Sequence, residues 1–300
     1  MNSKALPNFL IVGVARCGTT SLYHYLKQHP EIGFPKKKEP KYFSSLHLDF
    51  PQKGIGDHTV DEKIIKNFRE YQRLFAGLEN YSVIGEASSD YFYYHEKTIP
   101  EIKKTLGDVP ILISIRNPLD RCYSAYNNLV RDNREPLSFE RALKEEEERV
   151  KKGWDWMWAY KKGSLYADGI AAFQENFSKV KVVLFEDLQK DPKQVLREIE
   201  NFLSLKPYEK YDVSIKYSPS GNPKNKFIKL ISSRNSMCIN RMRTTAMSLI
   251  PRKYLEKVSA GFFSKDQIDG KTMDYLENYF AEDIRKTGEI IGNSLHVWKK

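Results

Sequence analysis

Two glycines five residues apart, Gly13 and Gly18, constrain this chain more than any other feature because of what flanks them. Residues 9–14 (FLIVGV) are continuous, apolar and rich in β-branched side chains, which predicts a strand covered on both faces. Residues 20–28 carry apolar side chains at helical spacing. A glycine-bounded turn between a buried strand and a helix is typical of a phosphate-binding loop.

Further strands and helices are predicted along the chain. Strands are expected at 83–85, 111–115 and 182–185, and helices at 118–131, 139–152, 167–177, 192–203 and 272–291. Strands that alternate with helices indicate βαβ units and a parallel sheet. We therefore expect an α/β fold, a single P-loop-like domain over residues 1–300 with a central parallel β-sheet flanked by helices. Ligands of such sheets bind beyond the carboxyl ends of the strands.

The loop lacks the lysine of a nucleoside-triphosphate site. A Walker A motif has lysine directly after its second glycine, where this chain has Thr19, and the cation stands two residues before the glycine, at Arg16. Backbone amides and hydroxyls can then hold a single 5′-phosphate. The predicted nucleotide contacts of this loop are Arg16, Cys17, Gly18, Thr19, Thr20 and Ser21. A plain strand-to-helix turn is the alternative.

A second anion site is predicted after the strand at 111–115. Arg116 stands at the carboxyl end of that strand, and Ser124 follows eight residues later in the next helix. Both side chains could reach one anion from there. By itself the pair also fits an ordinary salt-bridging arginine and a helix serine, but together with the first loop it favours a nucleotide with two phosphate groups.

These residues resemble the PAPS-dependent sulfotransferase family, and within it the carbohydrate (heparan sulfate-like) and bacterial branch. Residues 115–126 (IRNPLDRCYSAY) are the most specific match, within a resemblance covering residues 8–230. It implies that a sulfuryl group moves from PAPS (3′-phosphoadenosine 5′-phosphosulfate), which leaves as PAP, to a hydroxyl or amine of a carbohydrate or other small-molecule acceptor. It assigns the 5′-phosphosulfate to the first loop and the 3′-phosphate to Arg116, Ser124, Gly221 and Lys224.

The resemblance also implies the catalytic residues. The carbohydrate branch has a catalytic Glu three residues before an aromatic pair, which matches Glu39 in residues 38–43 (KEPKYF). The flanking lysines would keep this base ionised. Arg16, where the family usually has Lys, would neutralise the oxygen that leaves with the nucleotide. Glu86 is the second candidate base, although the family often has lysine where Ala87 follows it.

Three alternating tryptophans, Trp154, Trp156 and Trp158, allow two interpretations. They indicate either a half-buried segment or an acceptor-binding lip that stacks on a sugar or an apolar tail. A run of acids, residues 145–148, is most simply the solvated face of a helix.

Charge and composition restrict the partners. The net charge of +10 favours anionic ligands, but the basic residues are spread along the chain without a basic helix or a zinc-finger pattern, so we expect no nucleic-acid partner. The phosphate loop carries no acid or histidine, and we expect no metal. Two rivals remain open: a P-loop metabolite kinase that requires Mg²⁺, and a non-catalytic nucleotide- or polyanion-binding protein.

We expect neither a membrane span nor a secretory signal in this sequence. No stretch has the apolar length of a membrane span, which is about 18 residues, and residues 1–8 lack the order of a secretory signal. The three cysteines, Cys17, Cys122 and Cys238, are too scattered for a disulfide framework. These observations predict a cytoplasmic protein.

Overall fold

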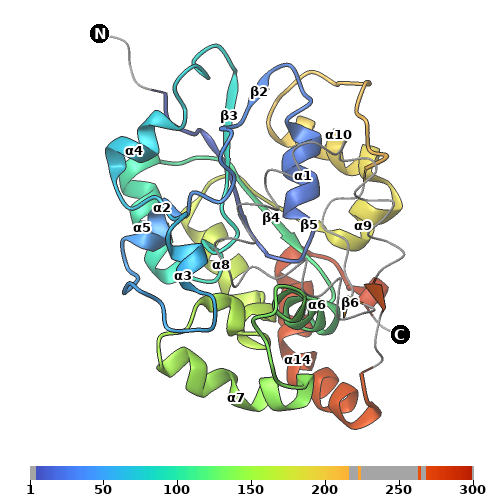
Figure 1. The fold of residues 1–300 in the computed structure, drawn as a ribbon. Helices are drawn as coiled ribbons and strands as arrows, with labels where there is room; N and C mark the ends of the chain where they lie inside the picture. Colours follow the sequence, from blue (N-terminus) through green and yellow to red (C-terminus); the bar gives the residue numbers. More distant parts are fainter. Residues whose placement is uncertain (1–4, 216–221, 224–262, 265–267, 299–300) are drawn as a thin grey trace.

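A parallel five-stranded sheet forms the centre of the molecule in the computed structural model, which describes residues 5–215, 222–223, 263–264 and 268–298. The strand order is β2-β3-β1-β4-β5, and helices cover both faces (Figure 1). The strands are β1 (Phe9–Gly13), β2 (Ile32–Gly33), β3 (Val83–Ala87), β4 (Ile111–Ile115) and β5 (Val180–Leu184). The expected α/β class with a central parallel sheet is confirmed.

The predicted helices are present, with small shifts at their ends. They are α1 (Thr19–Leu26), α6 (Pro118–Arg131), α7 (Phe139–Lys151), α8 (Ala167–Asn176), α10 (Pro192–Phe202) and α14 (Gly270–Ile291). Sequence reasoning missed α5 (His95–Leu106), because Pro100 inside it resembles a helix breaker. It also missed the short elements β2, α2 (Tyr42–Ser45), α3 (His58–Asp61), α4 (Phe68–Arg73) and α9 (Phe185–Lys190), and three 3₁₀ turns: η1 (Trp156–Trp158), η2 (Lys162–Ser164) and η3 (His296–Trp298).

Alternation along β1 divides the core between the two faces of the sheet. Phe9 and Ile11 pack in a cluster with side chains of α1 and α10, whereas Leu10 and Val12 pack in another with side chains of α5 and α8. All four side chains are buried, as expected of a strand covered on both sides. The sheet is therefore a rigid platform, and its strand ends hold the loops that follow them in fixed positions.

A third apolar cluster joins α6, α7, η1 and α14 where the chain continues past β4 (Figure 1). It contains Leu119, Phe139, Trp158 and Phe280. The acidic run at 145–148 is only partly a solvated face, and this expectation is corrected: Glu146 is buried and accepts hydrogen bonds from the backbone amides of residues 161 and 162. This layer connects the segment after β4 to the wall of the site described below. The expectation of one domain over residues 1–300 stays a prediction.

Candidate active site

The glycine-bounded loop after β1 has the geometry of an anion site. Gly18 has a φ of 86°, and a Cβ built on it would lie 2.7 Å from a ring carbon of Phe185, so this position requires glycine. Gly18 is also the N-cap of α1, where it supplies no side-chain acceptor, and the first turn contains no acid. The N–H groups and the partial positive charge of this helix end are therefore available to an anion.

Arg16 connects this loop to α6. Its Nε donates to Ser124 Oγ over 3.1 Å, and its Nη1 donates to Asn128 Oδ1 over 3.1 Å. Two residues that the sequence assigned to different phosphates thus lie in contact, although 108 positions separate them in the chain. The loop after β1 and the helix after β4 form one site at the carboxyl edge of the sheet, because β1 and β4 are parallel neighbours.

Positive charge accumulates at this edge. Burial, followed by the charges of Arg131 and Arg116, lowers the pKa of Arg16 to about 9. Arg116 pairs with Asp120 at 3.5 Å, one helical turn away, and its guanidinium lies 5.0 Å from the centre of the Phe185 ring. Arg16 remains protonated at neutral pH in this crowded cationic setting, which a ligand with several negative charges would relieve.

Glu39 lies at the same edge of the sheet, next to the carboxyl end of β3, where its backbone amide donates to the carbonyl of Ala87 at 3.0 Å. Its Oε2 accepts from the Ser89 backbone amide at 2.9 Å, and its Oε1 accepts from Ser89 Oγ at 3.0 Å and from Lys38 Nζ at 2.5 Å. Burial alone would raise the pKa of Glu39, but the charges of Lys38 and Lys41 and these hydrogen bonds outweigh it and hold the pKa below its ordinary value. The carboxylate is ionised at neutral pH, as expected from the sequence.

A cavity of about 110 Å³ adjoins both features. Val14, at the start of the phosphate loop, and Ser89, the partner of Glu39, both line it. The remaining wall includes Phe92, Tyr93 and Trp156. An acceptor group in this cavity would therefore lie beside the start of the phosphate loop and beside Ser89, the residue that holds the ionised carboxylate of Glu39 in place.

Comparison with known proteins agrees with this geometry. Residues 7–210 match the model of the Sulfotransferase family. The chain belongs to this family. A crystal structure of a sulfotransferase from Alicyclobacillus acidocaldarius is 32% identical, with a TM-score of 0.79, over 99% of this chain and 100% of that one.

Two curated relatives contain a similar region within longer proteins. The membrane-associated sulfotransferase kil1 of Dictyostelium discoideum is 35% identical over 147 residues, which are 47% of this chain and 28% of that protein. The bifunctional heparan sulfate N-deacetylase/N-sulfotransferase 4 of Mus musculus is 23% identical over 98% of this chain and 31% of its own length. The chain thus spans about three tenths of the length of these two relatives.

The second candidate base occupies a different environment in this sulfotransferase chain. Glu86 is fully buried in β3, where its Oε2 accepts from Tyr71 Oη at 2.7 Å and from Tyr91 Oη at 3.2 Å. Burial raises the pKa of Glu86 to about 7, against the hydrogen bonds that lower it. Glu39 differs from it, because its side chain is 26% exposed. The position of Glu86 therefore suits a core carboxyl better than a group that contacts an acceptor.

The three tryptophans divide between the two interpretations. Trp158 is completely buried, and its Nε1 donates to Asp57 Oδ1 at 3.0 Å, so it is part of the core. Trp156 lines the cavity beside Ser89 and, with the half-buried Trp154, also lines a second, larger cavity. Two of the three thus line cavities, and their role in binding an acceptor stays a prediction.

Sequence reasoning missed two residues of α6 that organise the site. Arg121 is buried, and its Nε donates to the carbonyl of Ala15 in the phosphate loop while its Nη1 donates to the carbonyl of Tyr160. Asn128 accepts from Arg16. Positions 117, 121, 124 and 128 follow one face of a helix, and this spacing of polar residues was a signal available in the sequence.

The remaining residues that were predicted to contact the nucleotide differ in their exposure. The Cys17 side chain is buried, and the Cys17 amide donates to the carbonyl of Val14. Cys17 therefore stabilises the conformation of the loop. Thr19 and Ser21 are largely buried in the first turn of α1, and Thr20 is partly exposed there. Gly221 and Lys224 lie outside the described residues.

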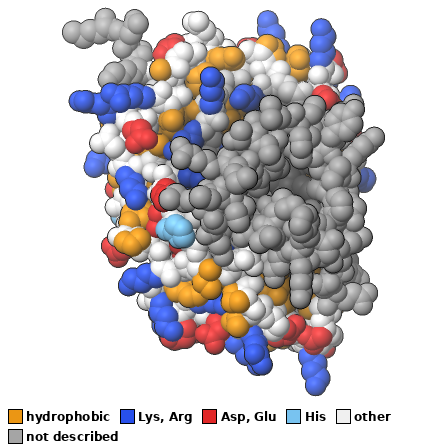
Figure 2. All heavy atoms as spheres, in the orientation of Figure 1, with side chains coloured by type: hydrophobic (Ala, Val, Ile, Leu, Met, Phe, Trp, Pro, Cys, Tyr) orange, Lys and Arg blue, Asp and Glu red, His pale blue; other side chains and the backbone are white. Residues whose placement is uncertain are grey.

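Three further observations concern the distribution of basic side chains, groups of metal ligands and membrane-spanning helices. On the face drawn in Figure 2, Lys and Arg side chains are scattered around the described surface and do not form one patch. Within the part of the chain that the structure describes, no group of His, Cys, Asp and Glu side chains has the arrangement of a metal site. None of the described helices is long and apolar enough to cross a membrane.

Proposed function

We propose that this chain transfers a sulfuryl group from PAPS to a hydroxyl or amine of an acceptor. The observation that carries this proposal is the contact of Arg16 with Ser124. This contact joins a phosphate loop without the Walker lysine to a second cation-hydroxyl site, so that the two form one site. A nucleotide with phosphate at both its 5′ and 3′ positions suits such a pair of sites, and family membership supports a sulfuryl donor.

The residues would divide the donor between them. The amides and hydroxyls at the N-terminus of α1 would hold the 5′-phosphosulfate, and Arg116 with Ser124 would hold the 3′-phosphate. Arg16 would lie near the bridging oxygen. Arg16 is protonated at neutral pH, so it would stabilise the charge on that oxygen as a cation.

The chemical step requires a base on the acceptor side. Glu39 would accept the proton of the acceptor hydroxyl as its oxygen attacks sulfur, an O–S bond would form, and the bond from sulfur to the bridging oxygen would break, so that PAP leaves with the electron pair. General-base assistance of this kind contributes about 10²- to 10⁴-fold to the rate. Positioning and electrostatic stabilisation supply the rest, and we expect no requirement for a metal ion.

A carbohydrate is the acceptor that we propose. Aromatic side chains line the cavity beside Ser89, and such rings commonly pack against sugars. The heparan sulfate N-deacetylase/N-sulfotransferase among the relatives acts, by its name, on a glycan. A cytoplasmic location stays a prediction.

Ligand-dependent melting tests the donor. PAP should raise the melting temperature without added metal, and far more than ADP does; a ligand at a hundred times its Kd adds about 2.7 kcal/mol to the free energy of unfolding. Equal shifts with ADP, or stabilisation by ATP only with Mg²⁺, would favour a metabolite kinase instead. Tight PAP binding with no transfer to any acceptor, and no effect of Glu39→Gln, would favour a non-catalytic binding protein.

A further inference from the structure

A second cavity of about 330 Å³ shares a wall with the one beside Ser89. Tyr93 and Trp156 line both cavities, and their ring centres lie 5.9 Å apart. Trp156 is held firmly, since it is 3% exposed and the Nζ of Lys41 lies 5.5 Å from the centre of its ring. An acceptor that packs on these two rings would therefore reach into both cavities.

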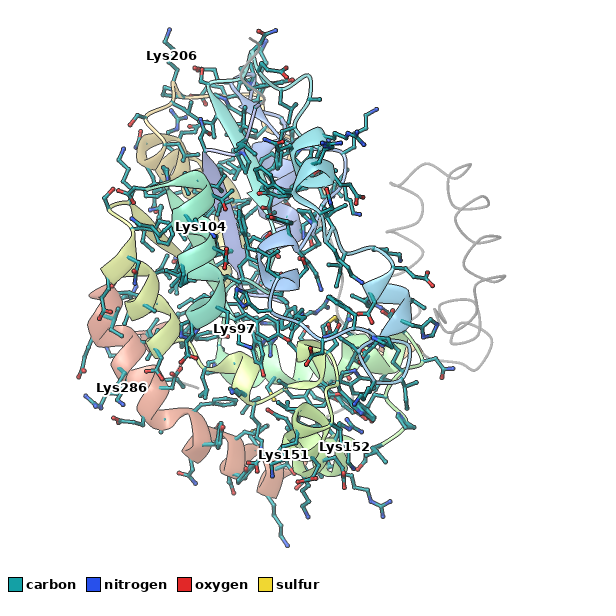
Figure 3. All side chains as sticks on the ribbon, turned by 90° about the vertical axis from the view of Figure 1, so that its left-hand side faces the viewer. Lys97, Lys104, Lys151, Lys152, Lys206 and Lys286 are labelled. Atoms are coloured by element: carbon teal, nitrogen blue, oxygen red, sulfur yellow. The ribbon has the colours of Figure 1, made fainter. Side chains whose placement is uncertain are left out.

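The larger cavity is basic. Lys53, Lys151 and Lys152 line it from two segments, which a backbone hydrogen bond from Lys53 N to Gly153 O joins at 3.0 Å. Asp49 is the one acid among its lining residues. Figure 3 shows Lys151 and Lys152 at the end of α7, on the opposite end of the molecule from Lys206.

The lysines of this cavity differ in their ionic partners. Lys151 pairs with Glu148 at 3.1 Å, but no ion pair joins Lys53 or Lys152 to another residue of the described part of the chain. Both are exposed cationic side chains. The two charges are thus available to a ligand that enters the cavity.

We propose that this second cavity is a subsite for an anionic group of the acceptor, a carboxylate or a sulfate ester. The inference rests on the proposed function and adds to it the charge of the acceptor. The reacting group lies beside Ser89, the chain of the acceptor crosses the rings of Tyr93 and Trp156, and its anionic group contacts Lys53 and Lys152. The nucleotide does not account for these lysines, because none of Arg16, Arg116 and Ser124 lines this cavity.

The experiment measures Kd for three matched glycosides with the PAP-loaded protein, by titration calorimetry. The probes are 4-nitrophenyl cellobioside, the same glycoside oxidised to uronic acids, and the same glycoside carrying 6-sulfate esters. The test variant is K53Q/K152Q. The control is K104Q/K206Q, two exposed lysines away from the cavity, which removes the same number of charges (Figure 3).

Wild type should bind at least one anionic probe more tightly than the neutral one, and K53Q/K152Q should weaken that probe about five- to tenfold, as expected of two solvent-exposed ion pairs. The neutral probe and PAP should bind unchanged, and the control variant should behave as wild type. Which of the two anionic probes loses affinity in K53Q/K152Q shows whether the subsite binds a carboxylate or a sulfate ester. Equal losses of affinity for neutral and anionic probes in K53Q/K152Q, or no preference of wild type for an anionic probe, would overturn the proposed subsite. PAP binding in the same experiment would still support the donor site. Failure of wild type to bind PAP overturns the proposed function itself.

Discussion

The proposed nucleotide side of the site comes from two short stretches, residues 13–21 and 116–128. The proposed acceptor side combines segments around residues 39, 47–53, 89–95 and 150–169. The first is built largely from backbone amides and helix ends, whose positions follow from the order of strands and helices. The second depends on side chains that meet only after folding. Local motifs therefore locate the proposed donor-binding residues well and the proposed acceptor-binding residues poorly.

Glu39→Gln tests the acceptor side most strongly. The substitution preserves size and deletes the basic lone pair, so kcat should fall about 10²- to 10⁴-fold while PAP binds as in wild type. Steady-state rates with an identified acceptor, together with a PAP titration, measure both quantities. Glu175→Gln, which removes an exposed acid on α8 that lines neither cavity, is the matched control.

The pH profile distinguishes Glu39 from Glu86. Because the pKa of Glu39 lies below its ordinary value of 4.5, kcat/KM should be flat from pH 8 down to about pH 5.5 and should fall only at lower pH. A base at Glu86, with its pKa near 7, would place the acid limb near neutrality. Full activity in Glu39→Gln together with an inactive Glu86→Gln would show that the base is Glu86, in the core, and not Glu39.

The protonation of Glu86 should make the free energy of unfolding depend on pH. Its pKa is about 7 in the folded chain and near 4.5 when unfolded, so the folded state binds the extra proton between these values. The stabilisation is complete below pH 4.5 and is lost as the pH rises through 7. Urea unfolding should show the difference in free energy between wild type and Glu86→Gln changing by about 3 kcal/mol from pH 4 to pH 8. A constant difference over that range would show that Glu86 is ionised in the fold.

Arg116→Ala tests the nucleotide side. It removes charge-assisted contacts worth about 1.5–3 kcal/mol, which corresponds to a PAP Kd raised roughly 10- to 150-fold. Arg285→Ala is the control, because Arg285 is an exposed α14 residue paired with Glu282. Unchanged PAP affinity in Arg116→Ala would exclude this residue from the site and weaken the two-phosphate interpretation.

The proposed nucleotide side could be outlined from the sequence because its signals are contiguous, and its role in binding stays a prediction. Gly18, Arg16 and Ser124 stand in motifs whose spacing is itself the physical requirement, and β1 and β4 bring them together by sheet order. The family resemblance, rather than the residues alone, pointed to Glu39. Its left-handed φ of 59° and its double contact with Ser89 carry no local signal.

The cavities show the same limit. The alternating tryptophans were ambiguous because only the fold decides which of them contact Asp57 in the core and which line a cavity. Lys53 and Lys152 are 99 positions apart, and neither stands in a motif. Their proximity depends on a turn contact between residues 53 and 153. Long-range side-chain assembly of this kind is outside the reach of periodicity and spacing.

Ser89→Ala should give the smallest effect and measures how much the acceptor side depends on one long-range contact. The substitution removes the hydroxyl donor to Glu39 Oε1 but keeps the backbone amide that donates to Oε2, and Lys38 and Lys41 remain beside the carboxylate. Losing a hydrogen bond to the charged form raises the pKa of Glu39, so the acid limb of kcat/KM should move upward by less than about one pH unit. The rate at pH 7.5 should stay within about threefold of wild type, since the base is still ionised there. Asn176→Ala, which removes a polar group on the exposed end of α8, should leave the limb unmoved. An acid limb that stays in place in Ser89→Ala, in an enzyme that Glu39→Gln inactivates, would show that the lysines alone set the charge of the base, and the acceptor side would then depend on local sequence as much as the nucleotide side does.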